Sequence, residues 1–408
     1  MGFTVEQECP QCGAPIVLDE TDRLLRCAYC NVKSLIFSPS YFRYRLPHRV
    51  SGEDIIYLPY LRFRGTIYFC KDLTIGYRIV DLTHTGLDIK GIPATLGIRP
   101  QAMKMRFLTS ETTGLFLRSR LDATDILTRA GKISSGTPKG RIFHRAFIGD
   151  TTSLIYLPMY IKGDALVDAV INRPVTGLTL GRESIETEAL KNPKWEIAFI
   201  PALCPACGWN LEGERDSVVH LCQNCGTAWA ARDGRLKPVQ FEIMYGRYER
   251  NIYLPFWKFT VISRDVGIKS FADFIRLTNQ PLAIDENWEK EDMSFWSPAF
   301  KIRPKLFLNI SRNLTIVRKE LKTENKIPRE PIFPVTLQLR EALQALKIIL
   351  AASCVDKRDL FPNLPRIRFE VKESILSYLP FAETTHDMIQ WDTGISINKR
   401  SLFYGRGL

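Results

Sequence analysis

Eight of the ten cysteines lie in four Cys-x2-Cys pairs, and this pattern limits the fold more than any other feature of the sequence. They form two groups of four: Cys9, Cys12, Cys27 and Cys30, and Cys204, Cys207, Cys222 and Cys225. In both groups 14 residues separate the two pairs, which is enough for a short hairpin that brings the second pair back to the first. Four thiolates brought together in this way form a closed tetrahedral site, the arrangement that structural zinc prefers.

The residue after each pair fits a tight turn around a metal ion. Glycine follows Cys12, Cys207 and Cys225, and asparagine follows Cys30. Glycine adopts positive φ without strain and lets backbone N–H groups approach sulfur, and asparagine is the next most tolerant residue in that region. The sequence therefore predicts a similar turn at all four pairs.

Residues 6–38 and 199–236, under a fifth of the chain, resemble the zinc-ribbon (rubredoxin-like) family. The resemblance implies two structural zinc ions, with the eight cysteines of the two groups as ligands. The rubredoxin branch holds iron, which would imply electron transfer; Tyr29, Trp209 and Trp229 suit either a shielded redox centre or a small domain with little other core. A closed four-thiolate site has no open position for substrate, so neither metal predicts catalysis there. Oxidation of the pairs with release of metal is a third interpretation, which nothing else in the sequence favours.

A long internal repeat runs through the chain. Each half carries, in the same order, a cysteine group, a Tyr-Leu-Pro sequence, an Ile-Arg-Pro sequence and a second Tyr-Leu-Pro sequence. The first copies of the tripeptides begin at Tyr57, Ile98 and Tyr156, and the second copies begin at Tyr253, Ile302 and Tyr378. The offset grows from 195 residues at the cysteines to 222 at the last tripeptide, so the second half contains insertions. Two similar halves could pack about a pseudo-two-fold axis, and the oligomeric state stays open.

We therefore expect an α+β fold that is mainly antiparallel β, in which each half is a four-cysteine ribbon attached to a β-rich domain. The expected units are residues 1–40 (first ribbon), 41–193 (first β-rich domain), 194–238 (second ribbon) and 239–408 (second β-rich domain). The boundary between the halves is placed near Asn192-Pro193, ahead of an apolar strand that leads into the second ribbon. A helical insertion is expected near 334–351.

Local patterns predict the elements of the two β-rich domains. Every Tyr-Leu-Pro copy lies in a β-branched and aromatic stretch, which favours a strand, and its proline predicts an interrupted ladder at that point. The helix expected over 334–351 rests on four leucines spaced along one helical face, Leu339, Leu343, Leu346 and Leu350. Shorter helices are expected over 164–172 and 270–277.

The formal charge of +12 raises the question of nucleic-acid binding. Each four-thiolate zinc site adds about −2, so the loaded chain is nearer about +8, and there is no run of five Lys or Arg residues. Arg62 and Arg64 share one face of an expected strand, and Tyr41–Arg49 interleaves arginines with aromatic residues. Such surfaces bind phosphates and stack bases, but they also describe a solvated sheet face, which is the interpretation we favour.

Motifs that mark common catalytic sites are absent from the sequence. There is no phosphate-binding glycine-rich loop, no His-Glu-x-x-His and no Gly-x-Ser-x-Gly, and the five histidines are scattered. His386-Asp387 would be an acid–base pair, but adjacent strand residues face opposite sides, which favours a surface histidine. The sequence therefore predicts no enzyme activity.

Export and membrane signals are also absent. The first residues lack the apolar region of a signal peptide, and no apolar run reaches the roughly 20 residues that cross a bilayer. Cysteines in metal-type pairs favour reduced thiolates in the cytoplasm over a secreted disulfide framework. Cys70 and Cys354 lie in apolar surroundings and are expected to be buried thiols.

Together these patterns predict a non-enzymatic, cytoplasmic scaffold or adaptor that holds two zinc ions and binds another macromolecule, with protein favoured over nucleic acid. The first alternative is a nucleic-acid-binding factor of the transcription or replication type, since ribbons of the family it resembles often occur in such proteins and the chain is basic. The second alternative is a subunit of a redox or enzyme complex. That role needs iron in the ribbons or an active site built from dispersed residues.

Overall fold

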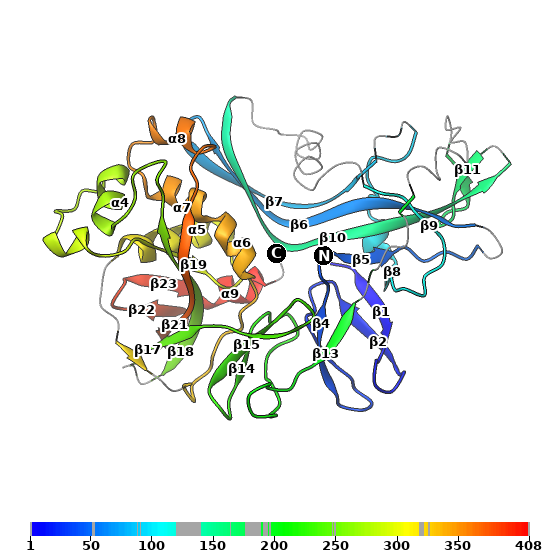
Figure 1. Ribbon diagram of the computed structural model, residues 1–408, viewed down its shortest axis with the longest axis horizontal. Coiled ribbons are helices and arrows are strands. Elements are labelled where there is room, and N and C mark those ends of the chain that lie inside the picture. Colours follow the sequence, from blue (N-terminus) through cyan, green and yellow to red (C-terminus); the bar gives the residue numbers. More distant parts are fainter. Residues whose placement is uncertain are drawn as a thin grey trace.

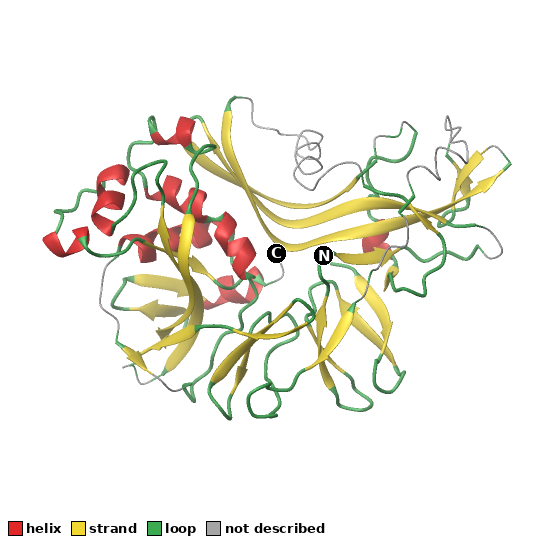
Figure 2. Ribbon diagram, viewed as in Figure 1, coloured by secondary structure: helices red, strands yellow, loops and turns green. Residues whose placement is uncertain are grey.

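The computed structural model describes residues 2–50, 54–87, 89, 91–119, 140–163, 165–175, 189–190, 195, 197–246, 248, 250–317, 322–324 and 327–406. These residues form a mainly β fold with two halves. In Figure 1 the first half lies on the right, the second half on the left, and the cysteine ribbons of both halves lie next to each other below them. Figure 2 shows that strands run through both halves and that most helices pack on the second.

The first half contains thirteen elements that the structure describes, and most of them are strands. They are β1 (Thr4–Glu8), β2 (Pro15–Asp19), β3 (Leu24–Arg26), β4 (Lys33–Phe37), β5 (Phe42–Arg45), β6 (Ile56–Lys71), β7 (Thr74–Thr85), α1 (Arg99–Ala102), β8 (Lys104–Phe107), β9 (Leu115–Phe116), β10 (Ile142–Lys162), β11 (Ala165–Asp168) and β12 (Arg173–Pro174). We call β1–β4 the first ribbon.

The second half adds longer helices to a similar set of strands. Its described elements are β13 (Ala198–Pro201), β14 (His220–Cys222), β15 (Thr227–Arg232), β16 (Arg235–Pro238), β17 (Phe241–Met244), β18 (Asn251–Ile262), α4 (Phe271–Thr278), a 3-10 turn (Glu286–Glu289), β19 (Ser294–Pro298), α5 (Pro304–Ile316), β20 (Thr323–Glu324), α6 (Leu339–Gln344), α7 (Leu346–Ser353), α8 (Leu360–Asn363), β21 (Glu370–Glu383), β22 (Asp387–Gln390), β23 (Ile395–Asn398) and α9 (Lys399–Gly405). We call β13–β16 the second ribbon.

The internal duplication is confirmed by the way the strands pair. In the first half β10 pairs antiparallel with β6 and parallel with β5; in the second half β21 pairs antiparallel with β18 and parallel with β17. The two Tyr-Leu-Pro copies of each half face each other across the central pair in the same register. Leu58 lies opposite Leu157, and Leu254 lies opposite Leu379. The repeated tripeptides therefore mark the two central strands of each sheet.

The prolines of these motifs lie where a central strand changes its outer neighbour. On β6, β9 pairs as far as Tyr57 and β7 begins at Tyr60, so Pro59 falls between the two ladders. On β21, β17 pairs as far as Tyr378 and β22 begins at Ala382, on either side of Pro380. The missing N–H of proline costs no ladder hydrogen bond at such a point. The predicted interruption is thus limited to the outer side, because the central pairing runs through the prolines without a register shift.

Both Ile-Arg-Pro copies lie at the start of a helix, which is a further sign of the internal duplication. Pro100 lies in the first turn of α1 and Pro304 in the first turn of α5. Proline suits this position because the first N–H groups of a helix have no partner within it and the fixed φ is already helical. The helices differ in length, 4 residues in α1 and 13 in α5, which is one of the places where the second half has grown.

The helix predictions are confirmed in part. The helix expected over 270–277 is α4, which Ser270 caps by accepting a hydrogen bond from the N–H of Asp273. The single helix expected over 334–351 is two helices, α6 and α7, which meet at Ala345. The helix expected over 164–172 is wrong: β11 forms an antiparallel hairpin with β10 there, because pairing at the sheet edge outweighs local propensity. The boundary expected at Asn192-Pro193 lies outside the described residues.

The long strands of the first sheet reach over the second half and join the two. Tyr68 on β6 and Ile148 on β10 belong to the main hydrophobic core of the second half. The hydroxyl of Tyr68 donates a hydrogen bond to the carbonyl of Pro304 at the start of α5, with an O···O distance of 3.2 Å. The two halves are therefore connected through buried contacts as well as through the chain.

A close approach between β6 and β10 gives a testable requirement for glycine. Gly65 lies opposite Gly149, and a Cβ at Gly65 would lie 2.2 Å from the Cα of Gly149. We expect Gly65→Ala to destabilise the protein by about 1–3 kcal/mol through overpacking, measured by thermal unfolding. Gly267→Ala is the control, because Gly267 also has positive φ but has open space around its Cβ position. Equal melting temperatures for the two variants would contradict this requirement.

Candidate metal centres and their surroundings

All four Cys-x2-Cys pairs end in the same turn. One backbone hydrogen bond closes each turn, with N···O distances of 2.8–3.0 Å: Gly13 to Cys9, Asn31 to Cys27, Gly208 to Cys204 and Gly226 to Cys222. The four donor residues have φ between 57° and 75°. This is the left-handed region that glycine and asparagine tolerate best, so the predicted turns are confirmed.

The turns bring the eight cysteine sulfurs together as two clusters of four. Within each cluster all Sγ atoms lie within 4.8 Å of one another. The closer Sγ···Sγ distances are 3.7 Å for Cys9–Cys30 and Cys12–Cys27, 3.6 Å for Cys204–Cys225 and 3.5 Å for Cys207–Cys222. Ligands at about 2.3 Å from a tetrahedral ion lie about 3.8 Å apart, whereas a disulfide would require about 2.05 Å. Each cluster therefore has the spacing and the donor atoms to hold one metal ion.

Donors around some of the sulfurs favour the thiolate form, whereas burial and the neighbouring thiols raise the pKa of Cys12 and of Cys222 to about 12. The N–H groups of Cys30 and Tyr29 approach the sulfur of Cys27 and lower its pKa to about 6. Burial opposes ionisation of Cys204, but hydrogen bonds from the Thr227 hydroxyl and from backbone N–H groups lower its pKa to about 6. Donors of this kind hold thiolates ready for a metal ion and stabilise them once it is bound. His220 is buried and lies outside the second cluster.

The two ribbons pack on each other, which the sequence did not predict. β13 of the second ribbon adds to β4 of the first, with Ala198 opposite Phe37 and Pro201 opposite Ser34. A small apolar core joins the two ribbons and contains Leu24, Leu35, Ala202, Cys204, Leu211 and Cys222. The sequence signal was the apolar strand ahead of the second cysteine group, but it did not reveal the partner of that strand.

Backbone contacts and the ion pairs of Arg215 with Asp19 and Asp22 strengthen the contact between the ribbons. The N–H groups of Arg23 and Leu24 both donate to the carbonyl of Arg215, at 2.6 and 2.9 Å. The guanidinium of Arg215 pairs with the carboxylate of Asp22. The halves do not repeat these contacts symmetrically, because β1, the counterpart of β13, pairs with β2 and β8. The pseudo-two-fold packing considered from the sequence is therefore not present in the ribbons.

Arg62 is buried in an ion-pair network, so its expected place on a solvated face is wrong. Its Nε and Nη2 donate to the carboxylate of Glu20 at 2.6 and 3.0 Å, and its Nη1 lies 2.8 Å from Asp81. Burial lowers the pKa of Arg62, but the two carboxylates outweigh it and raise that pKa. Arg64 is also buried. Burial of both side chains leaves these cations unavailable to nucleic acid.

The basic and aromatic segment over 41–49 is mostly half-buried, with Tyr44 and Leu46 buried and Arg49 exposed. Tyr44 is fully buried and stacks on Phe107 with ring centroids 5.1 Å apart. The guanidinium of Arg43 lies over the ring of Trp195, 5.3 Å from its centroid. Tyr44 and Arg43 therefore pack within the first half and are not open to base stacking.

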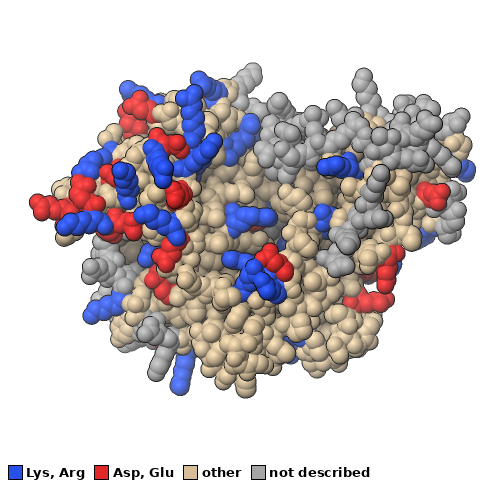
Figure 3. Space-filling view, in the orientation of Figure 1, with Lys and Arg blue, Asp and Glu red and all other residues tan. Residues whose placement is uncertain are grey.

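The ribbons expose apolar side chains close to both cysteine clusters. Tyr29, between two ligands of the first cluster, is 69% exposed, and Trp209, two residues after Cys207, is 56% exposed. Val17 and Leu203 are exposed on the same two ribbons. Figure 3 shows few Lys, Arg, Asp or Glu side chains on the lower part of this face, which the ribbons form in Figure 1. Tyr29 and Trp209 thus belong to the surface and not to a core over the metal sites.

Several smaller predictions concern single residues and spans. Cys70 and Cys354 are buried as expected, and burial raises the pKa of Cys70 to about 12. His386 is exposed, as expected for a surface histidine. Within the described part of the chain, no helix combines the length and the apolar character needed to cross a membrane.

The chain was compared with known protein families, curated proteins and solved structures. No protein-family model, no curated protein and no solved structure matches the chain.

Proposed function

We propose that the protein is a non-enzymatic scaffold whose two ribbons each hold a zinc ion and together present an apolar surface to a protein partner. The observation that carries the proposal is the exposure of the apolar side chains Tyr29, Trp209, Val17 and Leu203 on the two ribbons. Exposed apolar and aromatic side chains gathered on one surface are typical of protein–protein contact sites. Ribbons that are joined by a shared sheet hold such a surface rigid.

Zinc fits the clusters better than iron. Four thiolates in a closed tetrahedral arrangement suit both ions. An electron-transfer centre, however, is better served by a covered site, and two of the three aromatic side chains that could cover these clusters, Tyr29 and Trp209, are exposed. Because metal-ligand cysteines must stay reduced, we place the protein in a reducing compartment such as the cytoplasm.

Nucleic-acid binding has less support than protein binding. Arg62 and Arg64, two of the cations on which that alternative depended, are buried, and Arg43 packs on Trp195. The alternative then rests mainly on the overall positive charge, which by itself supports weak, salt-dependent attraction.

The partner surface is tested by purifying the protein from its native cells with cross-linking and identifying the copurified chains by mass spectrometry. We expect Tyr29→Ala combined with Trp209→Ala to lower recovery of a stoichiometric protein partner at least about tenfold, because aromatic anchors dominate such interfaces. Trp391→Ala is the matched control, since Trp391 is equally exposed but lies between β22 and β23 of the second half. Zinc content should stay the same in all variants. Recovery of nucleic acid alone, or of the same partner at undiminished yield, would contradict the proposal.

A further inference from the structure

A cavity of about 500 Å³ lies where the two ribbons meet the second half. This volume is typical of sites that bind small organic molecules. Its wall has three parts: residues 35–42 at and after the end of the first ribbon, residues 217–220 and 230–233 of the second ribbon, and residues 338–341 at the start of α6. A ligand in it would therefore touch both ribbons and the second β-rich domain at once.

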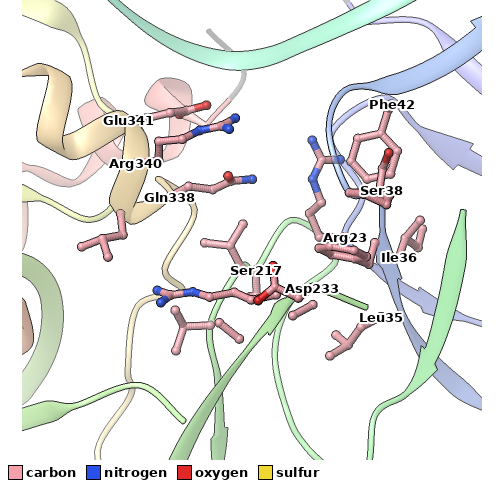
Figure 4. Close-up of a pocket in the computed structure, with 18 of the residues that line it drawn as sticks. Arg23, Leu35, Ile36, Ser38, Phe42, Ser217, Asp233, Gln338, Arg340 and Glu341 are labelled. Atoms are coloured by element: carbon pink, nitrogen blue, oxygen red, sulfur yellow. The ribbon is translucent and has the colours of Figure 1, made fainter. Parts of the chain in front are cut away.

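Arginines line the cavity from opposite sides. In Figure 4, Arg340 and Gln338 extend from α6 toward the wall that carries Arg23. Arg232, on the second ribbon, also lines the cavity. No carboxylate of a described residue lies within ion-pair distance of the guanidinium of Arg340 or Arg232. Figure 3 shows Lys and Arg side chains near the middle of this face, between the ribbons and the helical half.

Arg23 is held in place before any ligand arrives. Its Nη1 donates to the carbonyl oxygens of Glu20 and Asp22, at 3.1 and 2.9 Å. Its guanidinium lies over the ring of Phe42, 4.6 Å from the centroid. Both hydrogen bonds use Nη1. The N–H groups of Nε and Nη2 donate no hydrogen bond to a described residue. A fixed cation loses little conformational freedom when it binds an anion.

Acidic residues only partly offset these cations. Asp233 and Glu341 also line the cavity, against three arginines. Asp233 forms an ion pair with Lys237, and the hydrogen bond from that lysine lowers the pKa of Asp233. Three arginines against two acidic residues leave the wall with one net positive charge, although Glu341 lies beside Arg340 in Figure 4.

The deeper part of the wall is apolar. Leu35, Val219 and Trp257 are buried and line the cavity, whereas Arg340 and Arg232 are exposed. The indole N–H of Trp257 is already satisfied, because it donates to the carbonyl of Leu337 at 3.0 Å. The ring thus offers an apolar surface with no polar group that needs a partner.

We propose that this cavity binds an organic anion, a carboxylate or a phosphate ester, whose charged group lies between Arg23 and Arg340 and whose apolar part packs toward Trp257. A guanidinium can donate two parallel hydrogen bonds to either kind of anion, so the two arginines set the charge of the ligand and the buried wall favours an apolar body. Because the wall has three parts, a bound anion would also join the ribbons to the second half. This binding activity goes beyond the scaffold role and does not depend on it.

The test is calorimetric titration of the full zinc-loaded chain with phenyl phosphate, phenylacetate, inorganic phosphate and benzyl alcohol. We expect one of the two aromatic anions to bind with a stoichiometry of one, and the better of them identifies the phosphate or the carboxylate class. Benzyl alcohol should not bind, and inorganic phosphate should bind more weakly than phenyl phosphate. Binding of neither aromatic anion, or equal binding of the uncharged alcohol, would overturn the proposal.

Variants locate the binding in the cavity. Arg340→Gln should weaken binding of the better aromatic anion at least about tenfold, the loss expected for a charge-assisted hydrogen bond, and Arg340→Lys should restore part of it. Arg23→Gln should act in the same direction. Arg366→Gln is the matched control, because Arg366 is an exposed arginine that does not line the cavity. If Arg340→Gln and Arg23→Gln bind the anion as tightly as the unchanged chain does, the site lies elsewhere and the proposal is wrong.

Discussion

Serine in place of Cys12 or of Cys207 should lower the metal content from two ions per chain to one and lower the melting temperature by more than about 10 °C. Both cysteines are exposed, so the change removes a ligand without opening a core. Binding of structural zinc contributes about 10–16 kcal/mol in small ribbon-like domains, which is as much as the whole stability of many domains. In domains of about 150–250 residues each kcal/mol lost lowers the melting temperature by about 2–4 °C.

Cys354→Ser is the control for this result. Cys354 is buried but far from both clusters in the sequence, and its sulfur donates to the carbonyl of Asp356, a hydrogen bond that a serine hydroxyl can also make. This variant should keep two metal ions and melt close to the unchanged protein. A Cys12→Ser or Cys207→Ser variant that behaves in the same way as Cys354→Ser would show that the clusters do not hold structural metal.

Arg62→Met should destabilise the protein by about 3–5 kcal/mol, because it removes a buried guanidinium that pairs with the carboxylates of both Glu20 and Asp81. The side chains of Arg62 and Glu20 are 0% and 1% exposed, so water cannot replace the lost contact. Thermal unfolding of the zinc-loaded chain measures the effect. Adding Glu20→Gln to Arg62→Met should restore much of the stability, since an amide is less costly to bury than a charge.

An ion pair at the surface, between the first ribbon and β8, is the comparison for Arg62. Lys104 on β8 pairs with Glu6 on β1 at 3.1 Å, and both side chains are exposed. Pairs of this kind contribute little, because water and salt screen them. Lys104→Met should therefore change the melting temperature far less than Arg62→Met. Similar losses for the two variants would mean that Arg62 does not anchor the first ribbon to β6 and β7.

The local structure of the metal clusters could be predicted from the sequence because it depends on neighbouring residues. The spacing of Cys9 and Cys12, and the glycine that follows, are sufficient to specify the turn and the direction of the sulfurs. The repeated Tyr-Leu-Pro motifs likewise predicted the central strands. They did not predict that the Leu residues of two motifs face each other, because register depends on contacts across the sheet.

What could not be predicted depends on residues that are far apart in the chain. The pattern of Arg62 and Arg64 between apolar residues looks the same whether a strand has one solvated face or two covered faces. The partner that decides the matter, Glu20, lies 42 positions earlier, in the first ribbon. Pairing of β13 with β4 has the same character, since it joins strands of different halves. The expected helix over 164–172 is wrong for a related reason, because that segment pairs as a strand with the edge of β10.

Elemental analysis of the natively purified protein tests the central claim, that two closed four-cysteine clusters each hold one structural zinc ion. The expected result is two zinc ions per chain, no iron and a colourless solution. Iron in the clusters, with its visible absorption, would contradict the scaffold account and favour a redox role. A chain that carries fewer than two metal ions while it stays folded would show that the clusters are not the metal centres proposed.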